Sequence, residues 1–137
     1  GAAPRPRGRE GERMISLNYR DSRPIYEQIR DGLRKLIVTG ALSADEKLPS
    51  VRALAAQLAI NPNTIQRAYM ELEQQGLICP VKGKGSFVTD SSRIRQIGVE
   101  ETLSELKKIT EKGMALGVGE EEMIDVICSC YKEGNND

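Results

Sequence analysis

Two helix-start signals stand close together in the chain, and this pairing limits the folds that it can adopt. Ser50 can cap a short helix, because its hydroxyl can accept a hydrogen bond from an N–H group of the first turn. Asn61 and Pro62 then restart a helix almost at once, since asparagine caps well and proline fits the first helical position. Gly76 is suited to end this second helix. The apolar residues at helical spacing are Val51, Leu54, Ala55 and Leu58, followed by Ile65, Ala68, Tyr69 and Leu72. Two short helices that meet at a tight turn predict a helix-turn-helix.

The residues after Gly76 change to a pattern of strands and turns. Residues 77–79 and 86–89 have the composition of short strands, and residues 80–85 between them include two glycines and two lysines. A hairpin directly after a recognition helix is a wing, and a cationic tip of small residues can approach a phosphate backbone closely. The sequence therefore predicts a mostly α-helical fold with a small β wing, that is, a winged helix-turn-helix domain.

Three sub-motifs in this stretch carry a family resemblance. LPSVRALA, NPNTIQRAYMELEQQGLI and GKGSFV resemble, in order and spacing, the N-terminal winged-helix domain of GntR-family bacterial transcription regulators. The resemblance implies that Arg52 and the outer face of the second helix lie against DNA, and that Gly83 enters or borders the minor groove. Two positions depart from the family pattern, Asp45 where a turn glycine is common and Ala53 where an acidic residue is common. Neither is a base-reading position.

The candidate DNA-binding residues follow from this resemblance and from the chemistry of DNA recognition. Arg67 is the candidate for a guanine contact, and Thr64 can hydrogen-bond a phosphate or touch a thymine methyl group. Lys82 and Lys84 would supply attraction to phosphates that does not depend on sequence. The predicted set is Ser50, Arg52, Asn61, Asn63, Thr64, Gln66, Arg67, Lys82, Gly83 and Lys84.

Three segments are expected along the 137 residues. Residues 1–13 are rich in glycine, proline and arginine without periodicity, which predicts a disordered leader, either foreign to the natural chain or an arm that touches DNA. Residues 14–90 form the winged-helix domain. On its first helix, Arg30, Arg34 and Lys35 form either a phosphate-facing edge or, as we favour for most of them, a solvated face. Residues 91–137 form a helical region for dimerisation or effector binding.

The C-terminal region should begin at a joint near Ser91 and Ser92 and continue as a long amphipathic helix with a potential break at Gly98. Residues 117–119 separate it from a second helix with an acidic first turn, where negative charge suits the helix dipole. Two helices cannot close a core by themselves, so their apolar faces must pack on the winged helix, on a second copy of the chain, or on both. The predicted dimerisation residues are Ile94, Ile97, Leu103, Leu106, Ile109, Met114, Met123, Ile124, Ile127 and Tyr131.

Several kinds of chemistry are missing from the sequence. The chain has no histidine, so Ser/His/Asp and Cys/His catalytic sets cannot form, and there is no phosphate-binding or dinucleotide-binding glycine motif. The three cysteines suit neither a disulfide framework nor a zinc site, so we expect no metal, no cofactor and no thiol sensor. No apolar run is long enough to span a bilayer. A cytoplasmic protein that is not an enzyme is therefore expected.

These observations predict a homodimeric transcription regulator, most simply a repressor, that binds an inverted-repeat DNA operator. The short C-terminal region resembles the YtrA-like class of the family, which implies a transporter operon as a target. A small-molecule effector could bind between the C-terminal helices and the DNA-binding domain. The alternative is a winged-helix protein-interaction module without specific DNA binding. Such a module should expose more large apolar residues on residues 61–70 than Met70 alone.

Overall fold

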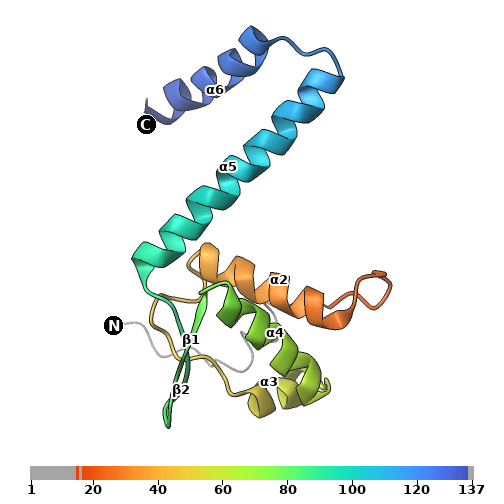
Figure 1. Ribbon diagram of the computed structural model, residues 1–137, viewed down its shortest axis with the longest axis vertical. Helices are drawn as coiled ribbons and strands as arrows, with labels where there is room; N and C mark the ends of the chain where they lie inside the picture. The colour runs from red at the N-terminus through yellow and green to blue at the C-terminus, as the bar shows by residue number, and fades with distance from the viewer. Residues whose placement is uncertain (1–14, 16, 136–137) are drawn as a thin grey trace. The chain divides into compact units, whose positions relative to one another are not determined.

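The computed structural model describes residues 15 and 17–135, and the predicted leader at residues 1–13 lies outside this part (Figure 1). Its elements are α2 (Ile25–Val38), α3 (Val51–Leu58), α4 (Pro62–Gln74), β1 (Ile78–Val81), β2 (Gly85–Val88), α5 (Ser91–Ala115) and α6 (Glu120–Asn135). The chain divides into two compact units, of which the first extends to Ile97 and the second begins at Gly98.

The helix-turn-helix forms with the caps that the sequence predicts. The Ser50 hydroxyl accepts a hydrogen bond from the Ala53 N–H at 3.1 Å and so starts α3. The Asn61 side-chain oxygen accepts one from the Asn63 N–H at 2.8 Å, and proline follows at the first position of α4. These side-chain oxygens satisfy N–H groups that have no partner within a helix. The two local signals therefore place α3 and α4 at a short turn.

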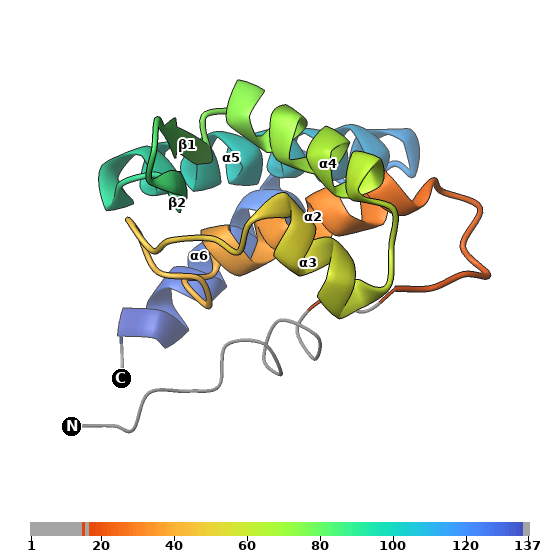
Figure 2. The same ribbon diagram turned by 90° about the horizontal axis from the view of Figure 1, so that it is seen from below.

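The apolar stripe of α4 forms the centre of the first unit. Its predicted residues, Ile65, Ala68, Tyr69 and Leu72, are all buried. They pack with Ile29, Leu33 and Ile37 of α2 and with Leu54 and Ala55 of α3. α4 contacts both of these helices, and Figure 2 shows the three around a common centre. Removing each such large side chain from water contributes about 1.5–3 kcal/mol to folding.

The hydroxyl of Tyr69 fastens α4 to the segment before α3. It donates a hydrogen bond of 2.7 Å to the Pro49 carbonyl, and burial raises the pKa of Tyr69, so the hydroxyl stays a donor. We expect Tyr69→Phe to lower the free energy of unfolding by about 1 kcal/mol and to lower the Tm by several degrees. Thermal unfolding of the variant measures this. Tyr19→Phe is the control, because that ring is 73% exposed; equal melting of the two variants would contradict the role of the bond.

The wing is an antiparallel hairpin in which Ile78 pairs with Val88 and Val81 pairs with Gly85. The predicted hairpin is confirmed, but β1 runs on through Pro80 and Val81, which the sequence pattern assigned to the turn. Pro80 is tolerated in β1 because the segment before α3, and not another strand beside β1, extends the pairing. On the far side of β2 the Leu48 N–H donates to the Ser86 carbonyl at 2.9 Å, and the segment before α3 lies along β2. β1 is therefore the outer strand, where a proline costs no ladder hydrogen bond.

Asp45 shows how this chain makes its turn without the glycine that is common in the family. Its φ is +64°, in the left-handed region, which aspartate tolerates better than most residues. Its N–H donates to the Val88 carbonyl at 3.1 Å. The departure in sequence thus leaves both the turn and its attachment to the wing in place.

Ser91 and Ser92, where the sequence suggested a joint, form the first turn of α5. The Asp90 carboxylate accepts a hydrogen bond from the Arg93 N–H at 2.9 Å, so the helix starts immediately after the wing. α5 also continues through Gly98 without a break. The two compact units divide within this helix, later than the boundary expected at residue 91.

Two of the predicted dimerisation residues have another role. Ile97 is 6% exposed and belongs to the core of the first unit, and Ile94 packs against the same core. Their apolar pattern is real, but the winged helix covers them within the same chain. Ile97 is therefore covered within the single chain, and Ile94 is covered in part.

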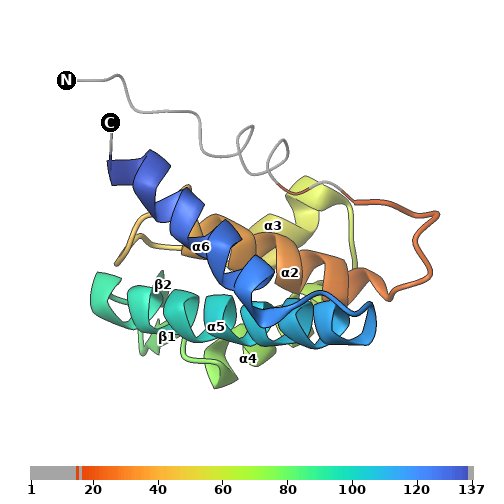
Figure 3. The same ribbon diagram turned by 90° about the horizontal axis from the view of Figure 1, so that it is seen from above.

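The second unit consists of the later turns of α5 and of α6, which turn back on each other (Figures 1 and 3). At their junction a Cβ added to Gly113 would lie 3.0 Å from Cε of Met123, so glycine permits this approach. None of the residues of α6 is buried. Leu103, Leu106, Ile109, Met114, Ile124, Ile127 and Tyr131 are all exposed in the single chain. No helix in the described part of the chain is long and apolar enough to cross a membrane.

Candidate nucleic-acid interface

The outer face of α4 is polar and open to solvent. Asn63, Gln66 and Arg67 are exposed there, and Thr64 is half-buried beside them. Met70, at 49% exposure, is the large apolar side chain exposed within residues 61–70. This is the face opposite the buried stripe, as the helical period requires. Its amide and guanidinium groups are the kinds that hydrogen-bond base edges and phosphates.

Ser50 and Asn61 already have structural tasks at this surface. Both are exposed, yet the side-chain oxygen of each accepts the capping hydrogen bond described above. Each cap thus holds the start of a helix at the surface predicted to meet DNA. Arg52, in the first turn of α3, is exposed and makes no ion pair with any residue that the structure describes. Its guanidinium is available for a phosphate or a base.

The wing tip places two cations on either side of a glycine. Lys82, Gly83 and Lys84 are exposed and join the two strands. Gly83 has φ +77°, and a Cβ there would meet nothing within 4 Å. The backbone conformation, rather than lack of space, therefore favours glycine at this position. The tip presents a small, positive surface suited to phosphates.

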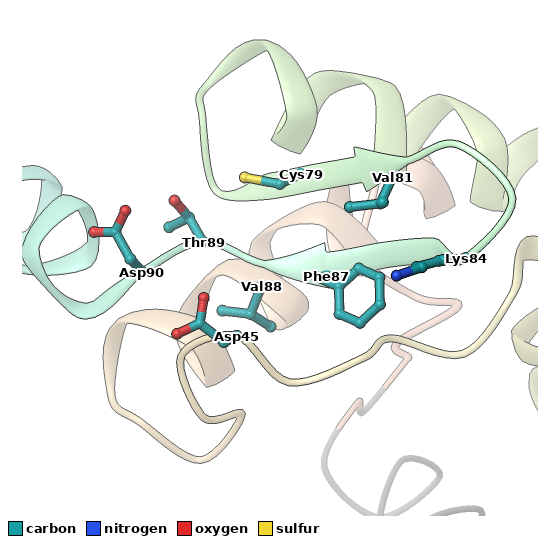
Figure 4. Close-up of a pocket in the computed structure, with 8 residues that line it drawn as sticks. All are labelled: Asp45, Cys79, Val81, Lys84, Phe87, Val88, Thr89 and Asp90. Carbon is teal, nitrogen blue, oxygen red and sulfur yellow. The ribbon is translucent and has the colours of Figure 1, made fainter.

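A shallow hollow of about 390 Å³ lies on one side of the wing (Figure 4). The residues that line it are Asp45, Cys79, Val81, Lys84, Phe87, Val88, Thr89 and Asp90. Figure 4 shows Lys84 and Asp90 at opposite ends of the hairpin, with Phe87 and Val88 between them.

Cys79, Cys128 and Cys130 are exposed free thiols. Among the residues that the structure describes, no cluster of cysteine and acidic side chains could hold a metal ion.

A ladder of three contacts joins α2 to one side of α4. The Arg67 guanidinium carbon lies 3.6 Å from the centroid of the Tyr26 ring. The Arg30 guanidinium donates to the Glu71 carboxylate at 3.0 Å. In the third contact, the Arg34 guanidinium donates a hydrogen bond to the Gln75 side-chain oxygen at 2.8 Å. Arg30 and Arg34 thus contact α4 and its end instead of forming the solvated face that the sequence favoured, whereas Lys35 is exposed as expected.

The spacing of this ladder was visible in the sequence. Its members stand four residues apart, at 26, 30 and 34 on α2, and at 67 and 71 on α4 with 75 directly after its end. Residues at this spacing share one side of a helix. The sequence alone did not reveal the contacts, because nothing in it states which sides of two helices meet.

Comparison with known proteins places this geometry in a known group. A family model described as "Bacterial regulatory proteins, gntR family" matches residues 25–88, from α2 to the end of β2. The HTH-type transcriptional repressor YtrA of Bacillus subtilis (strain 168) is 41% identical over 80 residues, which are 58% of this chain and 62% of YtrA. The match to YtrA thus covers less than two thirds of that protein.

Two further relatives match over most of their length. The uncharacterized HTH-type transcriptional regulator YhcF of Bacillus subtilis (strain 168) is 37% identical over 121 residues, which are 85% of this chain and 96% of YhcF. A solved structure of a GntR family transcriptional regulator from Listeria monocytogenes has a TM-score of 0.68 and 40% identity. It covers 80% of this chain and 96% of its own. The similarity therefore extends beyond the winged helix into the C-terminal helices.

Proposed function

We propose that this chain, which belongs to the GntR family of bacterial regulatory proteins, represses transcription by binding a specific operator as a homodimer. As a member of that family it is a DNA-binding transcription regulator rather than an enzyme. The observation that carries this proposal is the outer face of α4, which is polar and exposed, together with an exposed cationic wing tip. α4 would enter the major groove, and the wing would lie against the flanking backbone. Arg52, Asn63 and Gln66 would contribute further contacts.

The exposure of the α4 face also favours DNA over a protein partner. A protein-interaction surface concentrates aromatic and other large apolar side chains at its centre. On residues 61–70 the large apolar side chains other than Met70 are buried, and the exposed groups are amides and a guanidinium. This composition suits phosphates and base edges better than an apolar partner.

The dimer is proposed from the second unit. Leaving several leucine, isoleucine and methionine side chains in water costs about 1.5–3 kcal/mol each. A two-fold pairing would bury the same face on both copies and fix the separation of two recognition helices. The operator would then be an inverted repeat with half-sites about one helical turn apart. The resemblance to the short class of the family favours a transporter operon as the target, and regulation of transcription favours a cytoplasmic location.

The proposal is tested by replacing Arg67 with alanine. A pool of random duplexes selected with the parent protein supplies the binding sequence, and each of its base pairs is then varied. Arg67→Ala should cost about 1–3 kcal/mol on the selected duplex and weaken discrimination at one base pair. Fluorescence anisotropy at several salt concentrations measures both effects.

Lys84→Ala is the matched control, because it also removes one exposed positive charge from the predicted DNA-binding set. It should weaken binding to all duplexes to a similar degree and reduce the salt slope by about one. If Arg67→Ala binds selected and scrambled duplexes as the parent does, Arg67 is not a base reader. If the parent selects no common sequence, the proposed specific binding fails.

A further inference from the structure

We propose that Tyr26, on α2, is a positioning residue for DNA readout that holds the Arg67 guanidinium for its base contact. This inference rests on the proposed function. The guanidinium carbon lies 3.6 Å from the centroid of the Tyr26 ring, within the range of a close cation–π stack. No residue of the helix-turn-helix itself makes this contact, so the reader on α4 is held from outside the motif.

Stacking leaves the recognition chemistry of Arg67 free. A guanidinium carries its N–H donors in one plane, so a ring on its flat face does not occupy the edge that pairs with a guanine. Arg67 is exposed and makes no ion pair with a residue that the structure describes. The stack also restricts a side chain that would otherwise lose much rotamer freedom on binding DNA. It therefore prepares the donor edge before DNA arrives.

The Tyr26 ring is itself held in place. It is half-buried on α2, about one helical turn before Ile29, which is fully buried in the core. The adjacent rung of the ladder joins Arg30 to Glu71 at 3.0 Å, and the Tyr26 hydroxyl contacts the Glu27 carboxylate at 3.3 Å. With its neighbours fixed, the ring can transmit its position to Arg67. The stack is part of the α2–α4 interface and not a chance contact of a free arginine.

The experiment compares Tyr26→Leu with Tyr26→Phe in the full-length protein. Leucine fills apolar space but has no π face, whereas phenylalanine keeps the face and loses only the hydroxyl. An exposed cation–π pair corresponds to about a two- to five-fold change in an equilibrium constant. We expect Tyr26→Leu to lower discrimination at the base pair read by Arg67 by this factor, and Tyr26→Phe to restore it. The probes are the selected duplex and its variant at that base pair.

A second variant separates positioning from stability. Gln75→Ala removes the Arg34 contact at the other end of the same ladder. It should change thermal unfolding without changing discrimination, because it does not touch Arg67. In the Arg67→Ala background, Tyr26→Leu should have no further effect on discrimination. Non-additivity of this kind shows that both residues act through one contact.

The outcomes separate this inference from the proposed function. If Arg67→Ala weakens discrimination and Tyr26→Leu does not, the inference is overturned while the proposed function stands. If Tyr26→Phe loses as much discrimination as Tyr26→Leu, the hydroxyl and not the π face acts, and the inference is again wrong. If Arg67→Ala itself leaves discrimination unchanged, Arg67 is not a reader, and both the site assignment and the inference fail.

Discussion

Replacing Leu103 and Ile127 together with aspartate is expected to turn the protein into monomers and to weaken its binding to a paired operator by about a hundredfold or more. Leu103 is 60% exposed on α5 and Ile127 is 39% exposed on α6, and neither belongs to the buried core of the single chain. In a dimer, however, both charges would be buried without partners. Two linked DNA-binding modules gain about 10²–10⁴ in affinity over one, and the monomer loses this gain.

Sedimentation and binding to single and paired half-sites measure this prediction. Val126→Asp is the control, because it adds a charge at a side chain that is 65% exposed, lies about 100° around α6 from Ile127 and is not among the predicted dimerisation residues. The control should remain dimeric. If the double variant remains dimeric as well, the interface lies in the winged helix and the assignment to the second unit is wrong.

These substitutions test the dimer more cleanly than a chain cut directly after the wing. Such a cut would remove Ile94 and Ile97, which pack on the winged-helix core. Loss of DNA binding could then follow from an unstable domain rather than from a missing partner. A truncated protein would have to keep α5 at least to Ile97, where the first unit ends.

Ile65→Ala is expected to destabilise the winged helix by about 2–5 kcal/mol. Ile65 is fully buried where α4 faces the core, so alanine leaves a cavity there. A domain of this kind has a total stability of about 5–15 kcal/mol. The variant should therefore unfold at a much lower denaturant concentration and lose DNA binding at temperatures where the parent still binds.

Denaturant unfolding measured by circular dichroism tests this directly. Met70→Ala serves as the control on the same helix, because its side chain is 49% exposed and its replacement should change stability by only about 0.5 kcal/mol. A midpoint for Ile65→Ala as close to the parent as that of Met70→Ala would mean that α4 does not bury this side as described.

The predictable parts of the fold are those that local chemistry decides. Ser50 and Asn61 cap their helices because the partner N–H groups lie within the next three residues. The buried stripe of α4 follows from the period of one helix. By contrast, Ile94 and Ile97 form an apolar stripe that looks the same in sequence whether a domain or a second chain covers it. The hydrogen bond that the Asp90 carboxylate accepts from the Arg93 N–H marks where α5 begins.

The candidate site shows the same division. The polar face of α4 could be predicted, because it is the complement of the buried stripe. The stack of Arg67 on Tyr26 could not, since it depends on the way α2 crosses α4. A single sequence states which side of each helix is apolar, but not which polar groups meet at the margin of the contact.

Pro80 has a consequence for how this protein avoids wrong associations. β1 is the outer strand of the hairpin, and an outer strand offers unpaired N–H and C=O groups to any other extended chain. Pro80 has no N–H to offer, so the row of donors on that edge is interrupted. A second strand could not continue along it to form an extended sheet. The wing can thus project from the domain without becoming a template for aggregation.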